Sequence, residues 1–181
     1  RTPPGPIGSG AAYILEHDFS PNWSILFRLQ PPFFTNDFGW DVEMTNFLQY
    51  AVIGEPGFPA DLGRAYRYSG DTLLFSIDKV LTGPDSVTGF GQGVATDSLG
   101  LHLLVGSPLS NTVNLYMTPQ DSQEILGIWT GGDITVGGEN FGASTTLSKH
   151  GKIAVTGAPG HIHDGVMSAG AAYADNLCRR C

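Results

Sequence analysis

The segment GHIHDG at 160–165 holds the residue types in this chain that best suit chemistry. In an extended segment His161 and His163 point to the same side, because side chains alternate along the chain. Such a pair, with Asp164 beside it, could begin a zinc or copper site. A full ligand set is not identifiable, however, and exposed loops often contain these residues without a metal. We therefore expect a solvated or partner-contacting loop, made of Gly160, His161, Ile162, His163 and Asp164.

Two further motifs suggest covalent modification. Cys178 and Cys181 form a C-x-x-C pair, which alone does not complete a structural zinc set and lacks the strand-to-helix setting of a redox motif. We expect disulfides, either with each other or with protein outside this sequence, as is usual outside the cytosol. Asn22 begins the triplet Asn-Trp-Ser, which would accept a glycan in a eukaryotic secretory protein.

No catalytic motif is present. The sequence contains no G-x-S-x-G, no H-E-x-x-H and no P-loop, and GFGQG at 89–93 does not fit G-x-G-x-x-G. The acidic residues Asp37, Asp41 and Glu43 are more typical of a solvated rim than of a catalytic pair. We therefore predict that the chain is not an enzyme.

Composition excludes two classes of partner. The formal net charge is −8, only 14% of the residues are charged, and no basic patch is available to replace the counterions of a nucleic acid. No apolar run approaches the roughly 18 residues of a membrane span, and no secretory signal is visible. The sequence begins with Arg1, so we expect that a preceding segment has been removed.

A repeat organises the chain. Phe-Gly occurs at 38–39, 90–91 and 141–142, and each glycine precedes the glycine of a Gly-x-Pro by the same 15 positions (39 to 54, 91 to 106, 142 to 157). A tyrosine-centred segment follows each Gly-x-Pro after a stretch of varying length, and another apolar segment follows it in all but the last unit. Each unit of roughly 50 residues thus contains four strands and one variable loop.

Four-stranded antiparallel sheets of this kind bury both faces when they stack radially around a channel. We therefore predict an all-β fold, a β-propeller with units starting near 38, 90 and 141 and a partial blade at 8–37. Residues 1–177 form the propeller segment and 178–181 a tail. About three and a quarter blades are present, so further blades or other copies should complete a ring. The repeat aromatics are expected in the core: Phe38, Phe90, Phe141, Tyr13, Tyr66, Tyr116 and Tyr173.

The spacing of Phe-Gly, Gly-Ala-Pro and Gly-x-Ala-Tyr resembles the FG-GAP repeat of integrin alpha-chain β-propellers, over about residues 8 to 175. The resemblance implies a propeller outside the cell or on its surface. Many FG-GAP blades also carry an acidic calcium loop between the Phe-Gly and Gly-x-Pro strands. Here the corresponding stretches are 45–49, 96–100 and 148–152, and only Asp97 offers a carboxylate, so we expect neither calcium nor another cofactor.

These observations favour a non-catalytic extracellular module for recognition, adhesion or structural assembly. Protein or glycan partners would contact the variable loops, at 57–63, 109–112 and above all 159–169. One alternative is a carbohydrate-binding, lectin-like propeller in which Trp23, Trp40 or Trp129 stacks on sugar rings between blades. Another is an accessory propeller of a larger secreted enzyme.

Overall fold

The computed structural model describes residues 10–17, 21–32, 37–45, 49–57, 62–84, 88–118, 124–130 and 138–177. Within these ranges the regular structure consists of strands and the short 3-10 helix η2 (Pro108–Ser110). The strands group into four sheets, which we name blades A to D. Blade A holds β1 (Ala12–His17) and β2 (Trp23–Leu29). Blade B holds β3 (Val42–Met44), β4 (Tyr50–Glu55), β5 (Arg64–Gly70) and β6 (Phe75–Leu81). Blade C holds β7 (Gly93–Thr96), β8 (His102–Ser107), β9 (Thr112–Met117) and β10 (Glu124–Thr130). Blade D holds β11 (Ser144–Leu147), β12 (Ile153–Ala158) and β13 (Ala171–Asn176).

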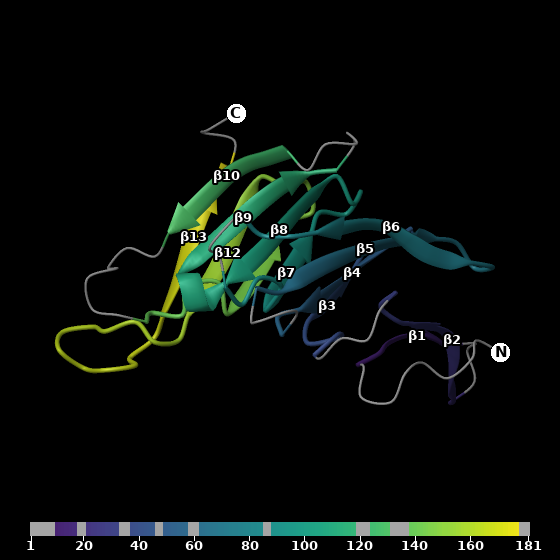
Figure 1. Cartoon of the computed structure of the whole chain (residues 1–181), viewed down its shortest axis with the longest axis horizontal. Coiled ribbons are helices and arrows are strands. Elements are labelled where there is room, and N and C mark those ends of the chain that lie inside the picture. Colours follow the sequence, from purple (N-terminus) through teal and green to yellow (C-terminus); the bar gives the residue numbers. More distant parts are fainter. Residues whose placement is uncertain are drawn as a thin grey trace.

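Every blade is an antiparallel meander in which consecutive strands are neighbours. The two, four, four and three strands of the described chain match the predicted three and a quarter blades, so the all-β prediction is confirmed. Figure 1 shows the blades following one another from purple to yellow. The first strand β7 contacts the first strands of both neighbouring blades, β3 and β11, as radial stacking requires.

A backbone hydrogen bond explains the constant spacing between Phe-Gly and Gly-x-Pro. The N–H of Gly39 donates to the carbonyl oxygen of Gly54 at 3.0 Å, and the same bond closes the next two blades between residues 91 and 106 (3.0 Å) and 142 and 157 (3.1 Å). The two glycines therefore sit opposite each other at the open end of one hairpin. A change in their spacing would shift every rung of that hairpin.

Glycine is required at Gly54 and Gly106 because neighbouring blades approach closely. A Cβ atom on Gly106 would lie 2.0 Å from the carbonyl oxygen of Gly142 in the next blade. The Phe-Gly glycines also have positive φ angles, 95° at Gly91 and 97° at Gly142, a conformation that other residues rarely adopt.

The core consists of three apolar clusters, one at each boundary between blades. Phe38, Phe90 and Phe141 are buried and pack edge-on against tyrosines of their own blades. The prediction for Tyr13 was wrong, since its side chain is 51% exposed. Its neighbour Ala12 faces blade B, so the alternation of side chains along β1 turns Tyr13 to the opposite face.

The tyrosine-centred strands exist as predicted, but their tyrosines are not equivalent. Tyr66 pairs with the residue one before the Gly-x-Pro glycine, and so does Tyr173. Tyr116 pairs with Leu103, three before that glycine, which is the place that Tyr68 holds in blade B. Tyr66 and Tyr116 nevertheless lie at similar distances along the sequence from the next Phe-Gly, because the connection from blade C to blade D is longer. The shift is therefore not visible in the sequence spacing.

Candidate functional site

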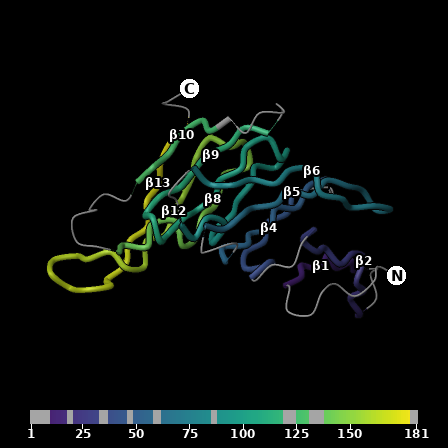
Figure 2. The backbone as a smooth tube through the Cα atoms, viewed as in Figure 1, coloured from purple at the N-terminus to yellow at the C-terminus, as the bar shows by residue number. Residues whose placement is uncertain are grey.

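The predicted interaction loop projects from blade D between β12 and β13, where Figures 1 and 2 show it in yellow. Its tip is a tight hairpin in which His163 and Val166 exchange backbone hydrogen bonds of 3.2 and 2.9 Å. Asp164 and Gly165 both have positive φ, 49° and 79°, as the Asp-Gly pair of a type I′ turn requires. The loop therefore has a defined conformation of its own.

Three side chains hold the base of this loop. His161 Nδ1 lies 2.9 Å from Oε1 of Glu139, which is buried, and the Tyr173 hydroxyl lies 3.2 Å from the same nitrogen. The N–H of Gly160 also donates to the carbonyl oxygen of Glu139 at 2.8 Å. This base ties the loop to the segment that precedes the Phe-Gly turn of the same blade.

Glu139 had no predicted role, although the repeat contains a signal for it. In blade C, Thr88 occupies the corresponding place two residues before Phe90, and its N–H donates to the Ser110 hydroxyl at 2.7 Å, 22 positions away. Glu139 and His161 are separated by the same 22 positions. A comparison of polar residues at this spacing would have found the pair.

His163 and Asp164 lie at the exposed tip, with His163 Nε2 3.5 Å from Asp164 Oδ2. His161 is engaged with Glu139 at the base, so the structure gives the two histidines different partners. Within the described ranges, no three side chains of the metal-binding types gather into a site. The apolar residues Val166 and Met167 complete the tip, with side chains 61% and 79% exposed.

The remaining candidate positions fall in several places. Asn22 is exposed just before β2. Leu109 is exposed on η2, while 58–61 of the loop at 57–63 and the pair Cys178 and Cys181 lie outside the described residues. Trp23 and Trp40 are exposed.

The Asp97 side chain forms hydrogen bonds within the hairpin between β7 and β8. Its Oδ2 lies 2.7 Å from His102 Nδ1, and its Oδ1 accepts the N–H groups of Leu99 (3.2 Å) and Leu101 (2.9 Å). The carboxylate is buried and shapes the turn.

The three acidic residues around the first Phe-Gly pair have different surroundings. Asp41 Oδ2 accepts the N–H of Val94 at 2.8 Å and so joins blades B and C. Partial burial raises the pKa of Glu43, and the negative charge of Asp41 raises it further. Asp37 is exposed.

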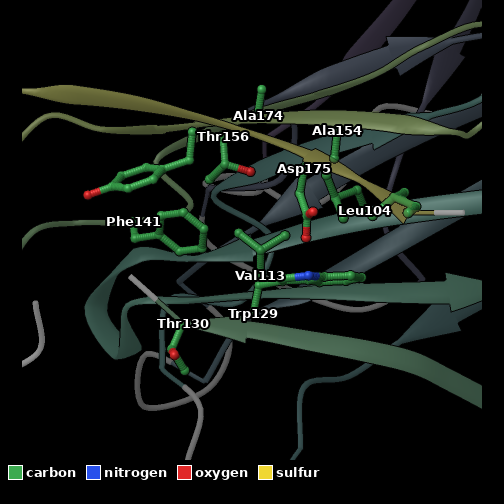
Figure 3. A pocket seen from close by; sticks show the side chains of 11 residues that line it. Leu104, Val113, Trp129, Thr130, Phe141, Ala154, Thr156, Ala174 and Asp175 are labelled. Atoms are coloured by element: carbon green, nitrogen blue, oxygen red, sulfur yellow. The ribbon is translucent and has the colours of Figure 1, made fainter. Parts of the chain in front are cut away.

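A pocket of about 240 Å³ lies between blades C and D. Leu104, Val113 and Trp129 line it from blade C. Figure 3 shows the Asp175 carboxylate of blade D pointing between the blades toward Val113 and Trp129. Trp129 thus lies in a pocket between blades, unlike the two exposed tryptophans.

No family model and no curated protein matches the chain. Among solved structures it is similar to hydrazine synthase of Kuenenia stuttgartiensis, with 12% identity and a TM-score of 0.52 over 84% of this chain and 48% of that one. It is also similar to the Cps50 (Swd1) β-propeller domain of Myceliophteria thermophila, with 9% identity and a TM-score of 0.51 over 73% of this chain and 39% of the other. The chain is part of a β-propeller. It spans less than half of either structure, and identities this low concern the fold alone.

The propeller topology places the predicted loops together. The connections β4–β5, β8–β9 and β12–β13 each join the second and third strands of a blade, so all three emerge at the same end. The loop of blade D is the longest of them. The described part of the chain contains no helix with the length and apolar character needed to cross a membrane.

Proposed function

We propose that this propeller segment is a non-catalytic recognition module that binds a protein partner through residues 159–169. The observation that carries the proposal is the apolar tip, where Val166 and Met167 are exposed on a hairpin held by its own hydrogen bonds. A partner with an apolar pocket would cover these two side chains and gain hydrophobic free energy.

The loop's structure lowers the cost of binding. The hairpin at 163–166 and the contact between His161 and Glu139 fix the backbone before a partner arrives. Less conformational entropy is then lost on association than for an unstructured loop of the same length. A polar rim around the tip, provided by His163 and Asp164, would add specificity.

We further propose that the module works outside the cell or on its surface, in adhesion or structural assembly. The support is the resemblance of the repeat to FG-GAP propellers, together with the exposure of the glycan acceptor Asn22. A cluster of polar side chains that anchors the base of a loop is consistent with recognition rather than catalysis.

Site-specific photo-crosslinking tests the role of the tip. A photoreactive residue at position 167 should capture a partner that the same residue at position 73 does not capture. Leu73 is a suitable control, because it is 86% exposed at the tip of a different hairpin, between β5 and β6. The captured protein would be identified by mass spectrometry and its affinity measured by calorimetry.

Paired variants then decide the assignment. Val166→Ser with Met167→Ser should weaken binding by at least about tenfold, because two apolar anchors are lost. Leu73→Ser with Leu74→Ser removes two similarly exposed leucines and should leave the affinity unchanged. Equal losses in both pairs, or no loss in the first, would remove the loop from the interface.

A further inference from the structure

The third strand of each complete blade carries a tyrosine at one particular rung. Tyr68 pairs with Ala51 and Tyr116 pairs with Leu103, each three residues before the glycine of Gly-x-Pro. In blade D the same rung pairs Ala154 with Asp175. An aspartate therefore stands where two other blades have a tyrosine.

Both tyrosines fill the boundary with the preceding blade. Tyr116 is buried, and its hydroxyl donates to the main-chain carbonyl of Thr82 at 3.2 Å. Tyr68 is also buried and donates to the carbonyl of Gln30. Gln30 and Thr82 each come directly after the outer strand of the preceding blade, so each boundary holds a phenol ring and supplies an acceptor for its hydroxyl.

The boundary between blades C and D is formed by the corresponding positions, but several of their side chains are smaller. By register, Ala154 replaces Leu103 and Thr156 replaces Val105, in addition to the replacement of Tyr116 by Asp175. These losses leave the 240 Å³ pocket, which is lined by Trp129 and by Thr130, the residue that corresponds to Thr82.

We infer that this pocket binds a phenolic ring, the group that tyrosines supply at the two corresponding boundaries. An apolar cavity of about 150 Å³ is sufficient for a benzene ring, so the volume suffices. Val113 and the Trp129 indole offer an apolar wall and an aromatic partner for the ring. The ring would lie the opposite way round from the two tyrosine side chains, with its hydroxyl toward β13, where the Asp175 carboxylate can accept it in a charge-assisted hydrogen bond. This site does not depend on the proposed partner loop.

Binding of p-cresol tests the inference, with toluene as the matched ligand that lacks the hydroxyl. We expect p-cresol to shift the indole N–H signal of Trp129 in a heteronuclear NMR spectrum, assigned with Trp129→Phe. Its Kd should be about 1 mM or lower, and at least about tenfold lower than that of toluene. Equal affinity for toluene, or tighter binding of benzylamine or of a monosaccharide, would overturn the inference.

Two aspartate variants locate the binding site. Asp175→Tyr should abolish p-cresol binding and raise the Tm, because the new ring fills the pocket. Asp175→Asn keeps the size of the side chain and should weaken p-cresol by about fivefold, through loss of the charge. Asp164→Tyr, on the exposed loop tip, is the control and should leave p-cresol binding unchanged. Unchanged binding in both Asp175 variants would exclude the pocket.

A comparison of ligands distinguishes two sources of the phenol. Binding of N-acetyl-tyrosinamide as tightly as p-cresol would indicate a tyrosine side chain from a partner protein. Binding of p-cresol alone would indicate a free phenolic compound. Either result supports a phenol site, and binding of neither contradicts it.

Discussion

The carbonyl oxygen of Gly91 occupies the space next to Gly54 into which a side chain would project, 1.9 Å from the position of a Cβ atom. Gly54 belongs to blade B and Gly91 to the Phe-Gly turn of blade C. The turn of each later blade therefore rests on a strand of the blade before it. This interlock makes Gly54 and Gly106 essential to the packing of one sheet on the next.

Gly54→Ala should destabilise the propeller strongly, because the new methyl group meets backbone that cannot move aside. We expect the free energy of unfolding to fall by about 3 kcal/mol, measured by urea denaturation. Gly157→Ala is the matched control, since Gly157 holds the same rung in blade D and a Cβ there would meet only the hydroxyl of Ser144, which can rotate. Its effect should stay below about 1 kcal/mol, and equal losses would refute the interlock.

Asn111 adopts in blade C a positive φ angle of the kind that glycines adopt in the other blades. Its φ is 51°, and its side-chain oxygen accepts the N–H of Phe141 at 3.2 Å. Asn111→Ala should lower the free energy of unfolding by about 2 kcal/mol, through backbone strain and the lost hydrogen bond. Asn111→Gly relieves the strain and should cost about 1 kcal/mol. The reverse order in thermal denaturation would contradict this role.

Stability should depend on pH through Asp71. Its Oδ1 accepts the N–H groups of Leu73 (2.7 Å) and Leu74 (3.1 Å), and these bonds hold its pKa below the ordinary value of 3.8. The contribution of the ionised carboxylate is complete above that value and is lost as the pH falls through the lower pKa of the folded state. Asp71→Asn should therefore be less stable than the unmodified chain at neutral pH and equally stable in strong acid. A difference that does not change with pH would contradict the assignment.

The base of the projecting loop should depend on Glu139. Glu139→Ala removes the partner of His161 and should lower the free energy of unfolding by about 1 to 2 kcal/mol. The amide of Gly170, which donates to the carbonyl of His161, should exchange faster with solvent. Asp164→Asn keeps a residue that tolerates the positive φ at this position, removes only the exposed ion pair and should change stability by less than about 0.5 kcal/mol. Unaltered exchange at Gly170 would argue against the anchor.

Much of the fold could be predicted from the sequence because its signals are local. The constant 15-residue spacing indicated strands joined by short turns, and in the structure it corresponds to a single hairpin closed by the bond between Gly39 and Gly54. The variable stretch after Gly-x-Pro predicted the projecting loop. Each of these features depends on neighbouring segments of one blade.

Features that involve two blades were not predictable in the same way. Tyr13 has the pattern of a core residue, yet no described blade covers its face. The shifted rung of Tyr116 appears only when strands are paired, and the importance of Asp175 depends on the tyrosines of other blades. A single sequence contains these residues but does not state which rung each one occupies.

The interlock also has a direction along the chain. Gly54 and Gly106 come earlier in the sequence than the turns that pack against them, at 91 and 142. During synthesis on the ribosome, each of these glycines therefore emerges before the turn that packs against it. Every new blade then meets a finished template, and assembly can proceed vectorially from the first blade to the last.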